Sequence, residues 1–195
     1  MRLFVALDID EPIRERIARF MDGVRGFAPD ARWARPESLH ITLKFIGQWR
    51  GEALEEVRRT LSSVQAQAVG LNLRGYGFFP SAKSARVFWV GIETGPELGV
   101  LAKSVDENLS TLGIARETHA FSPHLTLARG SGGSGSPRRQ RNDGPNRDFQ
   151  KLQEKLAALP APEFGTMTAR EFFLYESKLG PGGSRYTKLA TFPLL

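Results

Sequence analysis

The chain has 195 residues, of which 41% are apolar, with no cysteine and a formal net charge of +6. This length and apolar content allow a sizeable core and exclude disorder throughout the chain. The lack of cysteine excludes disulfide bonds, thiolate metal sites and a cysteine nucleophile. No segment approaches the roughly 20 apolar residues of a membrane span. We therefore expect a cytoplasmic protein whose chemistry comes from histidine, threonine, arginine and carboxylates.

The first half alternates strand and helix patterns. An apolar, β-rich run opens the chain, and Pro12 beside two acids is typical of a helix start. A later segment has Leu54, Val57, Leu61 and Val64 at helical spacing. These patterns predict strands at 2–9, 39–46, 71–79 and 85–92, the last two as a hairpin, and helices at 10–26 and 51–68.

The second half repeats the order less regularly. It predicts helices at 96–112 and 148–159 and strands at 124–128, 168–179 and 186–192. Residues 130–146 are rich in Gly, Ser, Pro, Asn and Arg, so they predict a mobile loop that follows the strand at 124–128 directly.

One four-residue pattern occurs twice, as His40-Ile41-Thr42-Leu43 and as His124-Leu125-Thr126-Leu127, with the histidines 84 positions apart. In a strand, alternate side chains share a face. Each motif therefore presents an imidazole and a hydroxyl on one face and two apolar anchors on the other. Two imidazoles at equivalent positions in two similar strands indicate paired acid–base chemistry.

The positive charge is concentrated after the second motif. Between Arg129 and Arg147 there are five arginines and one acid, a net charge of +4. Guanidinium groups pair with phosphate oxygens, which favours a phosphate-bearing ligand or a nucleic acid. The alternative is a solvated loop that is merely basic.

The twin motifs with their flanking phrases, 38–47 and 121–129, and the opening Arg2-Leu3-Phe4-Val5-Ala6-Leu7-Asp8 resemble the two-histidine (2H) phosphoesterases. Among these, the chain is most similar to the RNA 2′,3′-cyclic phosphodiesterases, also called 2′-5′ RNA ligases. The resemblance implies one bilobal α+β domain over 1–195, with two antiparallel sheets related by a pseudo-twofold axis, a central cleft between them and helices outside. It also implies hydrolysis that needs neither a metal nor another cofactor. Independently of the resemblance, we expect a monomer.

The resemblance further implies the roles of the motif residues. His40 would be the proton donor to the ribose 3′-oxygen and His124 the base that activates water, leaving a terminal 2′-phosphate. Thr42 and Thr126 would donate hydrogen bonds to the phosphate oxygens, and Arg129 would supply a fixed positive charge. The reverse reaction would be 2′-5′ ligation. The expected partner is RNA with a 2′,3′-cyclic phosphate end, including tRNA fragments.

Other residues have competing interpretations. Phe4, Phe79 and Arg86 are candidate substrate contacts. Phe45 occupies the place in the first motif that Arg129 has in the second, and we expect it to pack in the core. Trp33 and Trp89 are interpreted as core aromatics, Lys83 as a surface charge or a contact to the RNA backbone, and His119 as a rim residue.

Three alternatives stay open. The first is a non-catalytic module that binds RNA ends. The second is a metal-dependent hydrolase in which His40, His119 and His124 bind the metal, although no acid stands at a metal-ligand spacing. The third is a cyclic phosphodiesterase that acts on a small nucleotide.

Overall fold

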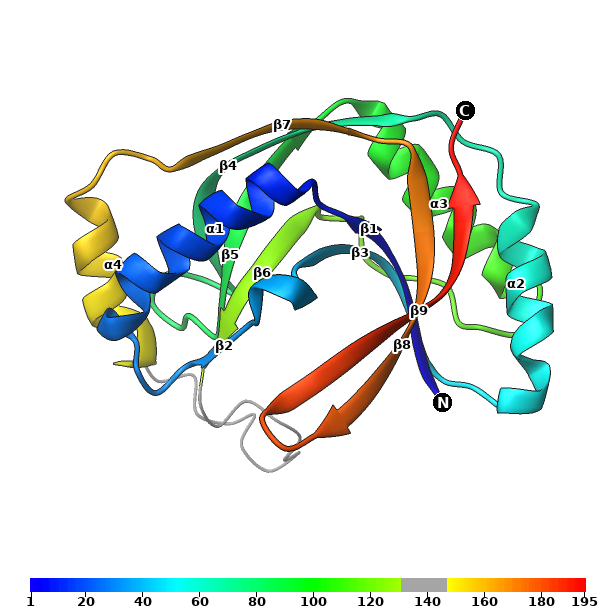
Figure 1. Ribbon diagram of the computed structural model, residues 1–195, viewed down its shortest axis with the longest axis horizontal. Helices are drawn as coiled ribbons and strands as arrows, with labels where there is room; N and C mark the ends of the chain where they lie inside the picture. Colours follow the sequence, from blue (N-terminus) through cyan, green and yellow to red (C-terminus); the bar gives the residue numbers. More distant parts are fainter. Residues whose placement is uncertain (131–146) are drawn as a thin grey trace.

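The computed structural model of the chain describes residues 1–130 and 147–195. One of its two antiparallel sheets has four strands in the order β3 (His40–Gln48), β1 (Arg2–Asp8), β8 (Glu171–Gly180) and β9 (Gly183–Pro193). The first and last parts of the chain thus lie side by side (Figure 1). Nearly all of β1 is buried, as its apolar run predicts.

The other antiparallel sheet has five strands. Their order is β2 (Arg32–Trp33), β6 (His124–Arg129), β5 (Val87–Thr94), β4 (Val69–Phe79) and β7 (Glu163–Ala169). The two motif strands, β3 and β6, contact each other where the sheets meet. The expected α+β fold with two antiparallel sheets is confirmed.

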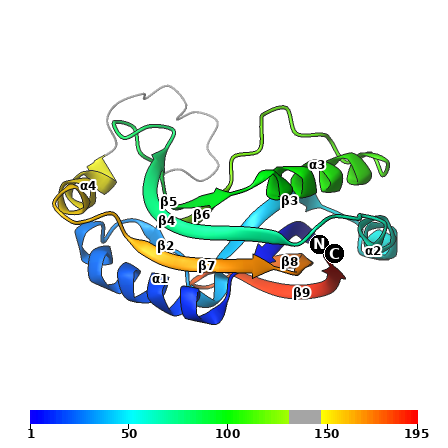
Figure 2. The same ribbon diagram turned by 90° about the horizontal axis from the view of Figure 1, so that it is seen from above.

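Helices cover the outer side of each sheet (Figure 2). The helix α1 (Glu11–Val24) packs on β7 of the five-stranded sheet, and α4 (Gln150–Ala157) lies near the end of α1. On the other side, α3 (Pro96–Ser110) contacts β3, and α2 (Leu54–Ser62) contacts α3 and β9. Short 3₁₀ turns occupy Arg25–Phe27, Pro36–Ser38, Gly51–Ala53 and Arg147–Phe149. No described helix is both long enough and apolar enough to cross a membrane.

The sheets do not coincide with the two halves of the sequence. The four-stranded sheet combines β1 and β3 from the first half with β8 and β9 from the end of the chain. The helix α1 leaves the four-stranded sheet and packs on the five-stranded one, and α3 leaves the five-stranded sheet and packs on β3. Each lobe is therefore built from both halves of the sequence.

Each motif strand contains a β-bulge. In β3, Thr42 pairs with Ala6 but Lys44 pairs with Val5, so Leu43 is the extra residue. In β6, the register of pairing to β5 shifts in the same way, which makes Leu127 the extra residue. A bulge reverses the alternation of side chains after it. The side chains that follow each motif therefore point to the face of the sheet opposite to the one that strict alternation predicts.

Three predicted elements differ from the structure. The helix expected at 51–68 ends at Ser62, because the following segment is extended and its Ala66 and Ala68 pair with Leu195 through backbone hydrogen bonds. The strand expected at 168–179 is two strands, because β7 and β8 belong to different sheets and the chain changes sheet at Arg170. The two-residue strand β2 lies in an expected loop. The loop predicted at 130–146 falls outside the described residues, apart from Gly130.

A buried lysine links the first motif strand to α3. The side chain of Lys44 is 2% exposed, and its Nζ donates hydrogen bonds to Oδ1 of Asp106 at 2.6 Å and to the carbonyl of Ala115 at 2.6 Å. It also pairs with Glu117 at 3.2 Å. Burial opposes the charge on Asp106, but the hydrogen bonds from Lys44 and the Glu117 amide outweigh it and hold the pKa of Asp106 below 3.8.

This ion pair gives a prediction about stability. Replacing Asp106 with asparagine leaves the buried Lys44 ammonium without its closest anion, so Asp106→Asn is expected to lower the free energy of unfolding by about 3 kcal/mol at neutral pH. A carboxyl with a lowered folded pKa stabilises the fold above its unfolded pKa and loses that effect as the pH falls through its folded pKa. The difference from wild type should therefore shrink in acid.

Urea unfolding at a series of pH values measures this difference. Glu107→Gln is the control, because Glu107 lies on the same helix in exposed pairs, and it should cost less than about 1 kcal/mol. If Asp106→Asn lowers the free energy of unfolding no more than Glu107→Gln does, or if its effect grows in acid, the structural role of the pair is contradicted.

Candidate active site

A large cleft lies between the two sheets, and both motifs line it. The lining includes His40 and Thr42 from β3 and His124, Thr126 and Arg129 from β6. The alternation predicted for the motifs is observed, because Ile41 and Leu43 of the first motif, and Leu125 and Leu127 of the second, are buried. The five residues expected to bind and cleave the phosphate are thus brought to one cleft.

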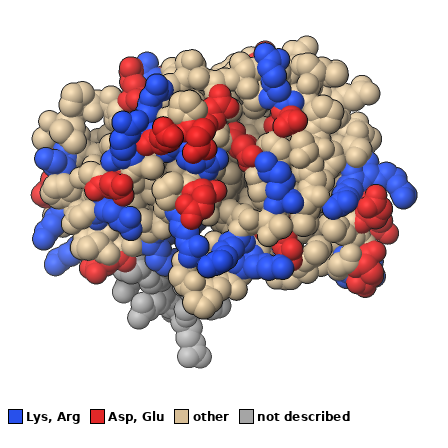
Figure 3. Space-filling view, in the orientation of Figure 1, with Lys and Arg blue, Asp and Glu red and all other residues tan. Residues whose placement is uncertain are grey.

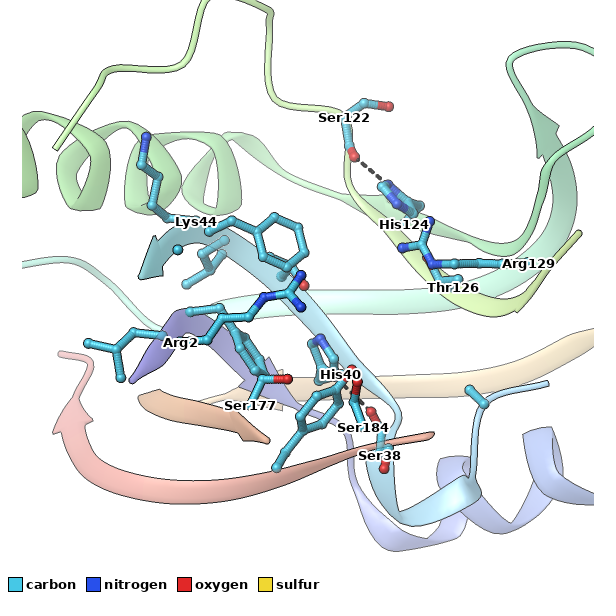
Figure 4. Close-up of a pocket in the computed structure, with 18 of the residues that line it drawn as sticks. Arg2, Ser38, His40, Lys44, Ser122, His124, Thr126, Arg129, Ser177 and Ser184 are labelled. Atoms are coloured by element: carbon cyan, nitrogen blue, oxygen red, sulfur yellow. Dashed lines mark hydrogen bonds between the residues drawn. The ribbon is translucent and has the colours of Figure 1, made fainter. Parts of the chain in front are cut away.

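Both imidazoles are anchored in the same way. Nδ1 of His40 lies 2.7 Å from the carbonyl oxygen of Ser38, and Nδ1 of His124 lies 2.9 Å from that of Ser122 (Figure 4). A carbonyl oxygen only accepts, so each Nδ1 carries the proton and donates it. The neutral imidazole then keeps Nε2 as an unprotonated atom, which suits it to accept or to return a proton.

An aromatic ring supports each histidine. The ring of Phe4 lies 4.8 Å from that of His40, and the edge of Phe79 meets His124 at 5.0 Å. Tyr186 contacts both His40, at 5.1 Å, and Phe4, at 4.9 Å, while Trp89 lies near His124. These contacts, together with the hydrogen bonds at Nδ1, restrict the rotation of both imidazoles.

The surroundings of His40 change its pKa. Burial is the main cause and lowers the pKa of His40 below 6.5, and the charges of Arg14 and Arg129 act in the same direction. The hydrogen bond to Ser38 and the charge of Asp8 oppose this lowering. Asp8 is the cross-strand partner of His40 and is itself held by Tyr175 and Lys188.

The bulges decide which residues follow the motifs into the cleft. Phe45 and Arg129 stand five positions after their histidines, and both line the cleft with exposed side chains. The prediction that Phe45 packs in the core is wrong, because its side chain is 58% exposed. The bulge at Leu43 turns Phe45 outward and Lys44 inward, towards α3 (Figure 4). The predicted asymmetry between Phe45 and Arg129 is present.

The other candidates are placed as follows. Phe4 lines the cleft, whereas Phe79 supports His124 from outside the lining. The side chains of Arg86 and Lys83 are exposed, and neither residue lines the cleft. His119 is exposed and lines the cleft, as expected of a rim residue.

The tryptophans are only partly buried. Trp33 packs its ring edge against Phe88 and donates a hydrogen bond from Nε1 to Ala28, but it also lines the cleft. Trp89 lies beside Phe79 and His124. Both therefore lie at the border between the core and the site.

Sequence reasoning missed several lining residues, among them Arg2, Ser177, Ser184 and Tyr186. Arg2 could have been found, because it alternates with Phe4 along β1 and so shares its face. The other three come from β8 and β9, and no local pattern in the sequence shows that these strands pair beside β1.

The face seen in Figure 3 carries basic and acidic side chains interspersed rather than one basic patch. Among residues 1–130 and 147–195, no group of three His, Cys, Asp or Glu side chains could hold a metal ion. Within the cleft, Arg129 is one of the residues that supply positive charge.

Known proteins are similar to this chain in sequence and in fold. A family profile described as "LigT like Phosphoesterase" matches residues 7–89 and again 90–186. A protein of Archaeoglobus fulgidus named RNA 2′,3′-cyclic phosphodiesterase is 34% identical, covering 98% of this chain and 99% of its own. One of Methanothermobacter thermautotrophicus with the same name is 33% identical, covering 100% and 99%.

A solved structure, that of Escherichia coli LigT complexed with 3′-AMP, superimposes with a TM-score of 0.76 and 26% identity, covering 99% of this chain and 97% of the other. The profile matches once in each half of the sequence, and each match contains one histidine motif. The resemblance to the two-histidine phosphoesterases is thus confirmed, and the chain belongs to the LigT-like phosphoesterase family.

Proposed function

We propose that the chain is a cyclic phosphodiesterase that hydrolyses RNA 2′,3′-cyclic phosphate ends to 2′-phosphates. The observation that carries this proposal is the pair of imidazoles in one cleft, each fixed at Nδ1 by a carbonyl and each with Nε2 left to exchange a proton. The names of the relatives support the choice of substrate.

The reaction needs one proton removed and one supplied. His124 takes a proton from water as the water oxygen attacks phosphorus, and His40 gives its Nε2 proton to the ribose 3′-oxygen as the P–O3′ bond breaks. The product carries a 2′-phosphate and a free 3′-hydroxyl. The two imidazoles then exchange protons with solvent. Each transfer contributes roughly 10²–10⁴-fold to the rate.

Thr42, Thr126 and Arg129 act on the phosphate itself. Each threonine lies two residues after its histidine, on the same strand face, so its hydroxyl reaches the oxygens between the imidazoles. Arg129 adds a fixed positive charge where negative charge builds in the transition state. The mechanism uses only these side chains, as a monomer and without a cofactor. The reverse reaction by the same pair would join a 5′-hydroxyl to a cyclic end.

The first prediction concerns the histidines. His40→Ala and His124→Ala should each lower kcat on a 2′,3′-cyclic phosphate by at least about 100-fold, because each removes one proton-transfer step. Phosphate release from RNA ends, coupled to a 2′-phosphatase step, measures the rate, and circular dichroism checks the fold. His119→Ala is the control and should keep most of the activity. Near-normal turnover by either motif variant would disprove the mechanism.

The second prediction concerns pH. In the free protein, His40 should titrate below 6.5, because burial disfavours its charged form. Since a general acid must be protonated, kcat/KM should fall as the pH rises through this pKa. Asp8→Asn removes a negative charge that raises the pKa, so it should move both the titration and this limb of the profile to lower pH.

Nuclear magnetic resonance of the His40 ring protons measures the titration. Asp10→Asn is the matched control, because Asp10 is exposed and lies just beyond the strand that carries Asp8. A shift to higher pH in Asp8→Asn, or an equal shift in both variants, would contradict this electrostatic account.

The third prediction concerns metals. Dialysis against excess chelator should leave kcat/KM unchanged, because the two imidazoles and Arg129 supply both proton transfer and charge. The measurement is the rate on a cyclic phosphate before dialysis, after it and after divalent cations are restored. Loss of activity that the cations rescue would favour the metal-dependent alternative.

A further inference from the structure

A second arginine faces the cleft from the sheet opposite Arg129. Arg2 begins β1, where it pairs with Gln48 on one side and Ser177 on the other. It shares a strand face with Phe4, two residues later, and both line the cleft. Figure 4 shows the guanidinium groups of Arg2 and Arg129 directed into the cleft from opposite sides.

The surroundings of the two guanidinium groups differ from those of several other arginines. Within residues 1–130 and 147–195, no carboxylate lies at ion-pair distance from Arg2 or Arg129, although Arg14, Arg74 and Arg116 all have such partners. A guanidinium that faces a cleft without a carboxylate is suited to bind an anion, and its fork of donors fits phosphate oxygens. Arg2 is therefore a candidate phosphate-binding residue.

The neighbours of Arg2 extend this site. Ser177, the cross-strand partner of Arg2 on β8, and Ser184, on β9, also line the cleft and offer neutral hydroxyl donors (Figure 4). Phe45 and Tyr186 are large rings exposed by 58% and 37% there. Burial raises the pKa of Tyr186, and Arg129 and Arg2 oppose this rise, so both arginines act on its hydroxyl. Exposed rings beside a cation form a surface on which single-stranded bases stack.

The position of Arg2 along β1 separates it from the reacting phosphate. Asp8 is the cross-strand partner of His40, and Arg2 lies six residues before Asp8, at the start of β1. Arg129, rather than Arg2, is among the charges that lower the pKa of His40. Arg2 is thus placed to meet a second anionic group beyond the one between the histidines. In RNA with a cyclic end, further phosphates exist only on the 5′ side.

We propose that Arg2, with Ser177 and Ser184, binds the phosphodiester immediately upstream of the cyclic-phosphate nucleotide, and that Phe45 and Tyr186 stack on the upstream base. This subsite rests on the proposed function and adds to it that an RNA chain, rather than a mononucleotide, is the preferred substrate.

The test compares two substrates with the same reacting end, adenosine 2′,3′-cyclic phosphate and the dinucleotide adenylyl-adenosine 2′,3′-cyclic phosphate. Wild type should have about tenfold higher kcat/KM for the dinucleotide, as expected for one charge-assisted contact. Arg2→Gln should bring the ratio of the two values close to one. It should also reduce the salt dependence of KM for the dinucleotide by about 0.7 in the logarithmic slope.

Arg185→Gln is the matched control, because it removes the same charge from β9 at an exposed residue that does not line the cleft, and it should keep the wild-type ratio. Ser177→Ala tests the same subsite without a change of charge and should lower the ratio in part. If Arg2→Gln does not fold, the ratio measured for Ser177→Ala decides whether the subsite exists.

Three results would overturn the subsite. The first is a wild type with equal kcat/KM for the two substrates. The second is an Arg2→Gln variant that lowers kcat/KM for both substrates by the same factor. The third is an Arg185→Gln control whose ratio falls as far as that of Arg2→Gln. A wild type that cleaves neither substrate would instead overturn the proposed function itself, so the two failures are distinguishable.

Discussion

An extra residue directly after the threonine of each motif decides which side chains follow the motif into the cleft. Leu43 and Leu127 are the extra residues, and each reverses the alternation of the strand behind the histidine and threonine. Without these bulges, Lys44 would share the cleft face with His40. With the bulges, Lys44 is buried against Asp106, and Phe45 and Arg129 occupy the exposed positions in the cleft. The two lobes thus share one backbone device and differ in the side chain that it presents.

The site is asymmetric although the motifs and their bulges are alike, because the residue that each bulge turns into the cleft differs. The second lobe presents a cation five residues after its histidine, and the first presents an aromatic ring. The cation of the first lobe comes instead from Arg2, on the neighbouring strand. One lobe therefore places its histidine and its cation on a single strand, while the other divides them between two strands.

The motif strands and the face that each histidine takes could be predicted from the sequence, because the period of a strand is local information. The placement of Phe45 could not, because a bulge is defined by pairing with another strand, here β1, and leaves no mark in residues 40–45. Tyr186 and Ser177 were missed because the pairing of β8 and β9 beside β1 is also long-range and leaves no local pattern in the sequence. The break at Arg170 was missed because β7 and β8 form one continuous strand-like run, and only the sheets that they join differ.

The pairing of β1 with β8 has a consequence for how the protein is made. The two strands lie more than 160 positions apart, and β1 has β3 on its other side. While the chain is being synthesised, β1 and β3 form at most a two-stranded pair. The other edge of β1 then stays unpaired, and the side chains of this strand are nearly all apolar. The wall of the His40 site needs Tyr175 and Tyr186, so it exists only after residues 171–193 have emerged. Such long-range closure slows folding, and during this delay the exposed edge of β1 is the part of the nascent chain most in need of protection from aggregation.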